Sequence, residues 1–495
     1  MKMPTPNADT LKRRGEIIER LRAIVPGEGV IVDENELKAY ECDGLMAYRQ
    51  LPMIVVLPET TEQVSAVLKT CHDMDVKIVP RGAGTGLSGG ALPLADAVTL
   101  GLGKFKKIID IDYDNRCVVV QPGVTNRAIT EAVEDAGYYY APDPSSKIAC
   151  TIGGNVAENA GGMHCLKYGL TTNNVLGVEM VLMSGEVVRL GGKHMDAGGL
   201  DLLGAVTGSE GLLGVITEVT VRILKQPEVA RGVLVGFPSV EAGGECVAKI
   251  IGSGIIPGAM EMMDKMIIGA MQDFVDSGYP LDVESLLVLE LDGPEAEVQY
   301  LTDRVKDIAA SVGSTYLRVS ESDEERQQMW KGRMSAFPSV GRISPDYMTM
   351  DGTIPRHRLA DVLTRMNELS QQHGLRVANV FHAGDGNLHP LILFDANKPG
   401  ELDKAEAFGH DILRLCVAVG GVLTGEHGVG VEKRDLMGEM FTEDDLKQQQ
   451  RLKCAFDGSG LLNPGKVYPT LHRCVELGRL HVTDGNIPFP DIPRF

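Results

Sequence analysis

The sequence lacks the basic surplus, the paired cysteines and the long apolar runs that identify several common protein classes. Its 48 lysines and arginines are outnumbered by 68 aspartates and glutamates, which gives a formal net charge of −20. A nucleic-acid groove requires a basic stripe, so this balance argues against nucleic-acid binding. Acidic enzymes are common, and the charge excludes nothing further.

The cysteines give no sign of a metal cluster. Nine cysteines are spread between Cys42 and Cys474, and no two of them form a C-x-x-C motif. An odd number of separated thiols fits a reduced, cytosolic protein. The pattern also excludes a zinc ribbon or an iron–sulfur cluster within this chain.

Long apolar runs are missing as well. No stretch of 18 apolar residues occurs, and residues 9–25 have the pattern of a charged amphipathic helix where a signal peptide would stand. We therefore expect a cytoplasmic protein that contacts a membrane only through partner proteins. With 495 residues, 43% of them hydrophobic, the chain should form two or more domains.

Glycine, by contrast, is concentrated between Pro80 and Ala91. Five of these twelve residues are glycine, in the order Pro-Arg-Gly-Ala-Gly-Thr-Gly-Leu-Ser-Gly-Gly-Ala. Repeated glycines let the backbone adopt positive φ and turn successive N–H groups inward, which creates an anion site suited to a pyrophosphate. Residues 84–89 satisfy G-x-G-x-x-G, but a loose run over 95–103 follows where a Rossmann fold needs a helix. For this stretch alone, a flexible surface loop remains the alternative.

Two later stretches favour the cofactor interpretation of this loop. Residues 141–146 form a stiff turn with two prolines, and residues 150–162 hold four glycines and two asparagines around a short apolar core. Backbone of this kind can pack against a flat ligand, while the amide side chains can bond its carbonyls and ring nitrogens. A third glycine loop, residues 207–218, leads into a strand pattern at 219–223.

The periodicity of the apolar residues predicts an α+β protein whose pattern changes near residue 230. A βαβ unit, with strands at 54–57 and 76–79 around a helix at 60–74, delivers the first glycine loop. Further predicted elements are strand 117–121, helix 126–136, a hairpin of 178–183 with 186–190, strand 232–237, helix 240–251, strand 286–291, helices 295–312 and 358–373, strands 377–381 and 391–394, and helices 402–419 and 442–456. We divide the chain into a helical lead-in (1–49), a first domain (50–227), a second domain (228–470) and an irregular tail (471–495).

Histidines and a glutamate stand among glycines in the second domain. If Asp385-Gly386 is the two-residue turn of a hairpin, His382 and His389 lie opposite each other with Cβ atoms roughly 5 Å apart. Two imidazoles so placed can share a divalent metal. The pair Glu426-His427 stands on another glycine-rich turn. One such histidine alone would usually be structural, but the set of four indicates a chemical site.

These glycine loops resemble the FAD-binding motifs of the vanillyl-alcohol oxidase / p-cresol methylhydroxylase (PCMH) superfamily. The resemblance lies in residues 80–91, 142–144, 151–162, 167–169 and 208–216. With the histidine motifs, the chain from about residue 50 to 470 resembles the branch that contains D-lactate dehydrogenases, D-2-hydroxyglutarate dehydrogenases and, most similar of all, the D subunits of bacterial glycolate oxidases. The resemblance implies a PCMH-type FAD-binding domain of two subdomains, followed by a ferredoxin-like α+β substrate domain.

The resemblance also implies how FAD is bound. The first glycine loop would hold the pyrophosphate, and the other two would line the isoalloxazine and adenine ends. Some relatives attach the flavin through a histidine near the first loop, but no histidine occurs between His72 and His164, so we expect noncovalent FAD. The implied FAD contacts are Pro80, Arg81, Gly82, Ala83, Gly84, Thr85, Gly86, Leu87, Ser88, Pro142, Asp143, Gly153, Gly154, Asn155, Asn159, Gly162, Tyr168, Glu210, Gly211, Ile216 and Asn463.

Four residues of the histidine motifs are implied to perform the chemistry. His382, His389 and Glu426 correspond to metal ligands, and nitrogen and oxygen ligands would suit zinc, manganese or iron. His427 corresponds to the base that removes the hydroxyl proton.

The resemblance further implies an anchor for a substrate carboxylate. Arg333, the last residue of Trp-Lys-Gly-Arg, can bind a carboxylate in a bidentate manner. Relatives that act on D-2-hydroxyglutarate carry a lysine and an asparagine where this chain has Thr349 and Leu391. We therefore expect a short 2-hydroxy acid without a distal carboxylate.

The expected reaction is the oxidation of glycolate to glyoxylate by hydride transfer to FAD. Iron–sulfur, haem and nicotinamide motifs are absent from the sequence, so the electrons should leave through partners. The resemblance implies the E-type flavin subunit and the F-type iron–sulfur subunit of glycolate oxidase, which deliver electrons to a membrane acceptor or another acceptor other than O2. The alternatives are a stand-alone FAD-dependent D-lactate or other D-2-hydroxy-acid dehydrogenase, a non-catalytic flavin relay or scaffold subunit, and a flavin-free binding protein.

Overall fold

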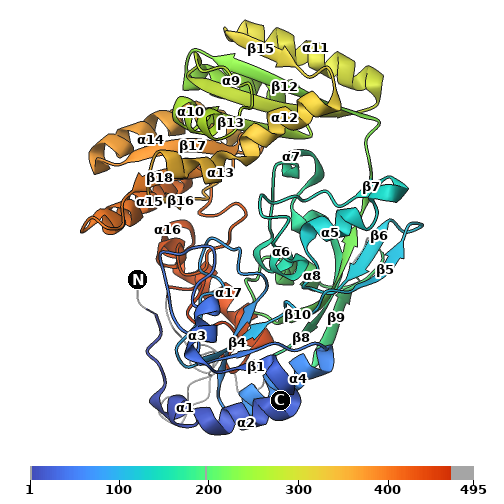
Figure 1. Cartoon of the computed structure of the whole chain (residues 1–495), viewed down its shortest axis with the longest axis vertical. Helices are drawn as coiled ribbons and strands as arrows, with labels where there is room; N and C mark the ends of the chain where they lie inside the picture. The colour runs from blue at the N-terminus through green and yellow to red at the C-terminus, as the bar shows by residue number, and fades with distance from the viewer. Residues whose placement is uncertain (1–2, 195–197, 470–495) are drawn as a thin grey trace.

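Four β-sheets organise the residues that the computed structural model describes, which are 3–194 and 198–469 (Figure 1). The first domain contains a four-stranded, a five-stranded and a small two-stranded sheet, and the second domain contains a seven-stranded sheet. Figure 1 shows the second domain as a separate layer above the two subdomains of the first. The tail predicted for residues 471–495 lies outside the described residues. None of the described helices is long and apolar enough to cross a membrane.

The first subdomain is built around a four-stranded sheet. Its elements are α1 (Ala8–Lys12), α2 (Arg14–Ile24), β1 (Val30–Ile31), α3 (Glu34–Leu37), β2 (Ile54–Val56), α4 (Thr61–Asp73), β3 (Lys77–Arg81) and β4 (Ala97–Gly101). The sheet order is β1-β2-β4-β3, in which β2 and β3 run parallel to β4. Helix α4 buries Val64, Val67, Leu68 and Cys71 in the core that it shares with this sheet. The 3.6-residue spacing of these side chains predicted that face.

The prediction of a loose run over 95–103 was wrong. Residues 97–101 form β4, whose five residues are all buried, and β4 lies between β2 and β3. A central strand of a parallel sheet is covered on both faces, so it is a short apolar run without polar alternation. Pro93 and Gly103 on either side gave it the appearance of a loop. The first glycine loop therefore leads to a strand, and no helix opens directly from it.

The second subdomain is a five-stranded antiparallel sheet with short helices. Its elements are β5 (Ile108–Asp112), β6 (Cys117–Val120), α5 (Asn126–Glu131), β7 (Tyr138–Tyr139), α6 (Ile152–Glu158), α7 (Cys165–Tyr168), β8 (Val175–Val181), β9 (Val187–Gly191), α8 (Leu202–Val206), β10 (Val215–Arg222) and β11 (Leu224–Lys225). The order is β5-β6-β10-β8-β9. The predicted hairpin is present, with the Leu182 N–H donating to the Glu186 carbonyl at 2.9 Å and Gly185 at a φ of 89° in the turn. Strand β10 begins at Val215, within the stretch 207–218 that was predicted as the third glycine loop, so this loop is shorter than expected.

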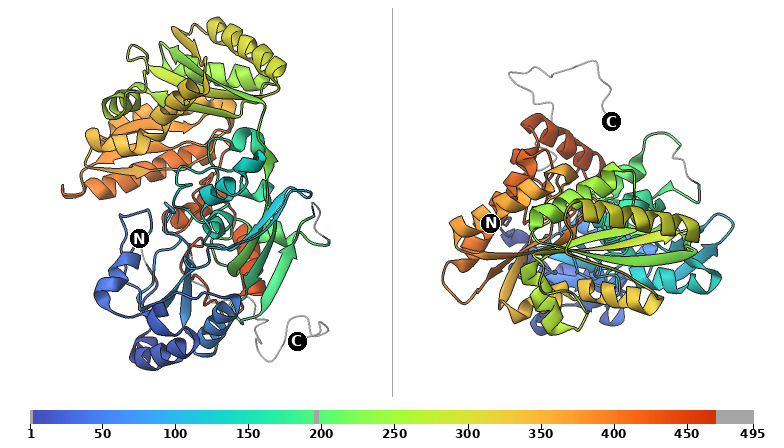
Figure 2. Two further views of the ribbon diagram at one scale, coloured as in Figure 1. Left: turned by 45° about the vertical axis from the view of Figure 1, so that its right-hand side comes forward. Right: turned by 90° about the horizontal axis from the view of Figure 1, so that it is seen from above.

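The second domain is a seven-stranded antiparallel sheet with helices on both faces (Figures 1 and 2). Its elements are β12 (Val229–Phe237), α9 (Val240–Gly252), β13 (Ala259–Asp264), α10 (Lys265–Phe274), β14 (Ser285–Gly293), α11 (Glu295–Ser311), β15 (Tyr316–Val319), α12 (Asp323–Met334), α13 (Ala336–Ser339), β16 (Asp346–Thr349), α14 (Leu359–His373), β17 (Arg376–His382), β18 (Pro390–Phe394) and α15 (Glu401–Ala418). The strand order is β15-β12-β14-β13-β17-β18-β16. Val233 and Val235 of β12 enter the core with α9, α11, α14 and α15, whereas Leu234 packs with α10 and α12. The predicted α+β class is confirmed.

The C-terminal segment returns from the second domain to the first (Figure 1). It contains α16 (Met437–Met440) and α17 (Glu443–Phe456). At its end Leu462 forms a parallel bridge with Ile78 of β3. At its start the Val431 N–H donates to the Ser88 carbonyl at 2.9 Å. The return therefore places the turn around Glu426-His427 next to the first glycine loop.

Ion pairs join the first domain to strand β14 of the second domain. His164 of the first domain contacts Asp143 through Nδ1 at 3.0 Å and Glu290 of β14 through Nε2 at 3.2 Å. Lys167 reaches Asp292, two residues along β14, at 2.6 Å. Burial alone would lower the pKa of His164, but Asp143 and Glu290 outweigh burial and raise the pKa to about 10. A charged imidazole thus holds the two domains together.

Replacing His164 with glutamine should make the melting temperature less dependent on alkaline pH. A group whose pKa rises from 6.5 to about 10 on folding stabilises fully below pH 6.5 and loses its contribution as the pH approaches 10. Asp143 and Glu290 stay ionised throughout, because their pKa values lie at about 2. Melting temperatures between pH 6.5 and 10 should therefore fall less steeply in H164Q than in the wild type, whereas the same exchange at the exposed His72 should not alter the slope. Equal slopes in H164Q and the wild type would contradict this role.

Candidate active site

A cavity of about 620 Å³ lies between the glycine loops of the first domain and the histidine motifs of the second. Residues 80–87, 150–151, 153–155 and 209–211 line one side, and Met334, Phe337, Pro338, Tyr347, His389, Glu426 and His427 line the other. The predicted cofactor contacts that line it are Pro80, Arg81, Gly82, Ala83, Gly84, Thr85, Gly86, Leu87, Gly153, Gly154, Asn155, Glu210, Gly211 and Ile216. The fold thus brings three separate glycine loops and part of the histidine motifs to one space.

Two positions in the first glycine loop require glycine, one for close backbone approach and one for its φ angle. A Cβ on Gly82 would lie 2.5 Å from Thr151 Oγ1, so the first two loops approach too closely for any other residue. Gly84 has a φ of +72°, which other residues rarely adopt. Thr151 Oγ1 is buried and has no hydrogen-bond partner among the described residues. Close backbone approach and an unpartnered polar atom fit a cradle for FAD.

Other predicted cofactor contacts do not line the cavity. Asn463 donates to the carbonyls of Gly90 at 3.1 Å and Glu210 at 2.7 Å, which fixes the first and third loops to the C-terminal segment. Glu210 accepts the N–H groups of Val429 at 2.6 Å and Gly430 at 2.7 Å, so its carboxylate binds the turn after His427 although it borders the cavity. These contacts shape the cavity wall. The predicted residues that do not line it are Ser88, Pro142, Asp143, Asn159, Gly162, Tyr168 and Asn463.

The predicted register of the histidine hairpin is two residues in error. The structure pairs His382 with Asn387 rather than with His389, so the loop spans four residues, 383–386. Asp385 stabilises this longer turn by accepting the Asn387 N–H at 3.0 Å, and Gly386 has a φ of 84°. A shift of two residues leaves every side chain on its original face. The two imidazoles therefore still meet, with ring centroids 5.0 Å apart.

The structure brings the three predicted metal ligands together. Nε2 of His382 and Nε2 of His389 both face Glu426 Oε1, at 3.2 and 2.9 Å. The second nitrogen of each ring is already bonded, His382 Nδ1 to Glu261 Oε1 at 2.7 Å and His389 Nδ1 to the Met350 carbonyl at 3.3 Å. Glu426 is itself one of the predicted ligands, so both Nε2 atoms point to the space between the three side chains, while each Nδ1 faces a second oxygen to which it can donate. This donor set fits a divalent metal such as zinc, manganese or iron.

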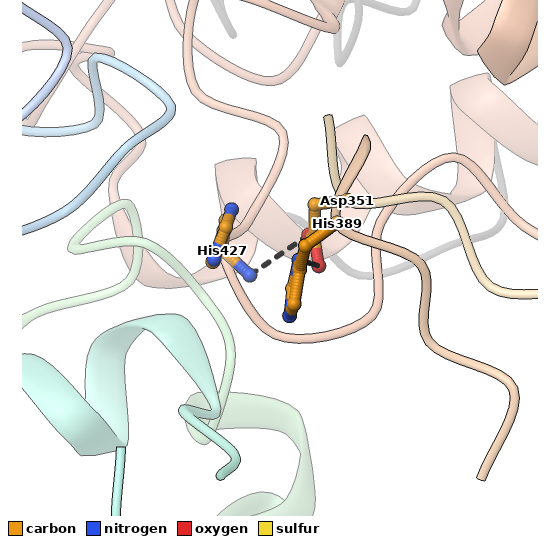
Figure 3. A group of neighbouring side chains, drawn as sticks. All are labelled: Asp351, His389 and His427. Atoms are coloured by element: carbon orange, nitrogen blue, oxygen red, sulfur yellow. Dashed lines mark hydrogen bonds and ion pairs between the residues drawn. The ribbon is translucent and has the colours of Figure 1, made fainter. Parts of the chain in front are cut away.

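His427 lies beside this group and borders the cavity (Figure 3). Its ring stacks on His389 at 4.9 Å between centroids, with 11° between the planes. Nδ1 is buried without a hydrogen-bond partner among the described residues. Burial lowers the pKa of His427 to about 4, against the opposing effect of Asp351. A neutral imidazole in this position can accept a proton.

Asp351 organises the turn that carries Glu426 and His427, and the sequence analysis missed it. Its fully buried carboxylate accepts the N–H groups of Gly425 at 3.1 Å, Glu426 at 3.2 Å and His427 at 2.9 Å. Figure 3 shows dashed lines from the Asp351 carboxylate to the backbone N–H of His427 and to His389. Lys433, also fully buried, lies 3.7 Å from the same carboxylate. The one signal in the sequence was an aspartate two residues after the short strand β16, which ends at Thr349.

Arg333 is buried behind the cavity and does not line it. Its Nε and Nη2 bind Glu261 Oε2 at 2.9 and 2.7 Å. Burial tends to raise the pKa of Glu261, but His382 and Arg333 outweigh burial and lower it. The sequence analysis missed Glu261 too, although a carboxylate between methionines in the run 259–264 was a signal. The expected carboxylate anchor is thus part of an internal ion pair beside the predicted metal ligands.

Comparisons with known proteins agree with this architecture. The FAD binding domain family matches residues 52–191, and the family of FAD linked oxidases, C-terminal domain, matches residues 226–467. The chain is 55% identical to "Glycolate oxidase subunit GlcD" of Escherichia coli (strain K12), with 97% of each chain covered. It is 32% identical to the D-lactate dehydrogenase of Archaeoglobus fulgidus, over 84% of this chain and 91% of that protein. The solved structure of p-cresol methylhydroxylase with substrate bound has a TM-score of 0.78 at 17% identity, with 93% of this chain and 97% of that chain covered, and shows the shared fold.

The fold and the cavity define a two-domain flavoprotein oxidoreductase. The chain belongs to the FAD-linked oxidases, the family that includes the GlcD subunits and the D-lactate dehydrogenases.

Proposed function

We propose that this chain is the catalytic FAD subunit of a glycolate-oxidising enzyme and converts glycolate to glyoxylate. The observation that carries the proposal is the position of His389, Glu426 and His427 on the wall of the same cavity that the FAD cradle lines. A base and a metal-ligand set beside a flavin site suit the oxidation of a 2-hydroxy acid. The 55% identity to a GlcD subunit supports glycolate as the substrate.

The metal would be zinc, manganese or iron, held by His382, His389 and Glu426. Two nitrogens and a carboxylate leave coordination positions for an α-hydroxy acid, and a metal there supplies Lewis-acid polarisation of the substrate hydroxyl. FAD bound in the cradle supplies a two-electron acceptor for the α-hydrogen. His427 removes the hydroxyl proton, and Asp351 keeps the backbone of His427 in place for this step. Loss of the proton and of the α-hydrogen with its electron pair gives the 2-oxo acid.

The lining of the cavity supports a short substrate. The second domain contributes Met334, Phe337, Pro338 and Tyr347 to the wall. Arg81, the one lysine or arginine among the described lining residues, donates to the Cys42 carbonyl at 2.7 Å. A distal carboxylate would therefore meet apolar groups and no free cation. Thr349 and Leu391, which pair across adjacent strands, supply neither the lysine nor the asparagine of relatives that act on D-2-hydroxyglutarate.

We propose that the electrons leave through partner subunits, namely an E-type flavin subunit and an F-type iron–sulfur subunit in the cytoplasm at the membrane surface. The printed name of the E. coli relative, a subunit, supports an assembly of several chains. The cavity also suits D-lactate, and 32% identity to a D-lactate dehydrogenase supports a stand-alone enzyme as the second candidate.

Anaerobic titration of the purified protein distinguishes these candidates. Glycolate should bleach the flavin absorbance band near ~450 nm without any partner, because the substrate and FAD sites are in one chain. Acetate, which has no hydroxyl group, is the control and should leave the band unchanged. Bleaching by D-lactate but not by glycolate would favour the D-lactate dehydrogenase. No bleaching by either acid in a yellow, metal-loaded protein would contradict catalysis by this chain and favour a relay subunit.

A further inference from the structure

We infer that Glu261 is a positioning residue that fixes the proposed metal ligand His382 to Arg333 of helix α12 through a single carboxylate. This inference rests on the proposed function, because it assigns Glu261 to the same site. None of the three side chains is more than 5% exposed. Each oxygen of Glu261 serves one of the two partners.

The sheet places Glu261 for this task. Strands β13 and β17 pair so that Glu261 lies directly opposite His382. Its Oε1 meets His382 Nδ1 at 2.7 Å. A backbone hydrogen bond also joins the hairpin loop to β13, since the Gly384 N–H donates to the Met260 carbonyl at 3.1 Å. Because Nδ1 is held by a carboxylate, the ring can turn only Nε2 toward His389 and Glu426. Such carboxylate–histidine pairs orient metal ligands and strengthen their affinity.

Helix α12 brings the second partner. Arg326, Trp330 and Arg333 occupy one face of the helix at positions i, i+4 and i+7. Arg326 and Trp330 bind Glu290 of β14, whereas Arg333 binds Glu261 of the neighbouring strand β13. The helix is therefore fixed to the sheet by two buried carboxylates, one outside the site and one inside it.

Glu261 neutralises the buried positive charge of Arg333. Among the described residues, Glu261 is the carboxylate with which Arg333 forms an ion pair. A buried guanidinium without a partner is strongly disfavoured and moves to find one. Loss of the Glu261 charge thus disturbs His382 and Arg333 together, while FAD, bound by the first domain, is retained.

The test compares Glu261→Gln with Glu290→Gln in the full-length FAD protein. Glutamine keeps the shape of each side chain but removes the charge, and both glutamates anchor α12. After metal removal, Zn²⁺ affinity is measured by competition with a chelator, and FAD content and circular dichroism report the fold. E261Q should bind Zn²⁺ about 10- to 100-fold more weakly than the wild type. Its KM for glycolate should rise more than its kcat falls. E290Q should keep wild-type Zn²⁺ affinity, because Glu290 touches neither His382 nor Arg333.

Each outcome of the Zn²⁺ titration has a defined meaning. Equal Zn²⁺ affinity in E261Q and the wild type would overturn the positioning role, even if both proteins oxidise glycolate. A wild-type protein that oxidises glycolate but binds no Zn²⁺, Mn²⁺ or Fe²⁺ would overturn the metal site and this role with it, whereas failure of the flavin titration above concerns the reaction alone. If E261Q does not fold, Glu261→Asp replaces it. Aspartate keeps the charge but is one methylene too short to span both partners, so Zn²⁺ affinity should again fall, and wild-type affinity in E261D would overturn the inference.

Discussion

Replacing His427 with glutamine is expected to lower kcat for glycolate by about 10²- to 10⁴-fold, the usual contribution of a general base. Glutamine keeps a polar side chain of similar length but cannot accept the hydroxyl proton. The His427 backbone N–H, which donates to Asp351 at 2.9 Å, is unaffected by the exchange, so the turn should stay in place. FAD should also be retained, because the cradle belongs to the first domain.

The rate to measure is that of flavin reduction in an anaerobic stopped-flow experiment. This half-reaction separates the chemistry on this chain from the delivery of electrons to a partner. A matched exchange is His373→Gln, since His373 stacks on Phe408 and bonds to Asp411 at 2.9 Å and does not line the cavity. H373Q should reduce its flavin at the wild-type rate. An equally fast H427Q would rule out His427 as the base.

Local patterns in the sequence predicted most of the fold. Helices such as α4 and α9 have an apolar face at 3.6-residue spacing, and each was expected within two residues of its observed ends. Strands were missed where the local pattern is weak. β4 is a short buried run between a proline and a glycine, and β13 contains two carboxylates, Glu261 and Asp264. The position of these strands in their sheets depends on pairing between distant segments.

The candidate site was predicted less completely than the fold, because its contacts are non-local. The residue types and their spacing in the sequence predicted the glycine loops and the histidines. The predicted hairpin register was wrong by two residues, which leaves His382 and His389 on the same face. Glu261 and Asp351 could not be assigned in this way. Each becomes part of the site only through pairing of distant strands or the return of the C-terminal segment. Arg333 was predicted to meet a substrate carboxylate, yet its contacts with Glu261 could not be inferred without the position of α12 over the sheet.

Replacing Gly86 with leucine is expected to weaken FAD binding in a protein that remains folded. Gly86 lines the cavity, and a Cβ built on it has no protein atom within 4 Å, so a side chain there projects into the space of the cofactor. Its φ lies outside the left-handed range, and leucine can therefore adopt the backbone conformation. Overpacking by a side chain typically costs about 1–3 kcal/mol, which corresponds to an FAD affinity lower by about 5- to 150-fold.

The matched control for this prediction is Gly103→Leu. Gly103 also has no atom within 4 Å of its Cβ and no left-handed φ, but it is exposed and does not line the cavity. The affinity is measured by quenching of FAD fluorescence on addition of the apoprotein, and the melting temperature of each apoprotein reports stability. G103L should bind FAD like the wild type, and the G86L apoprotein should melt at the wild-type temperature. Wild-type FAD affinity in G86L would mean that the cofactor does not pass over the first glycine loop, and the cradle would then have to be assigned to the loops at 150–155 and 209–211 alone.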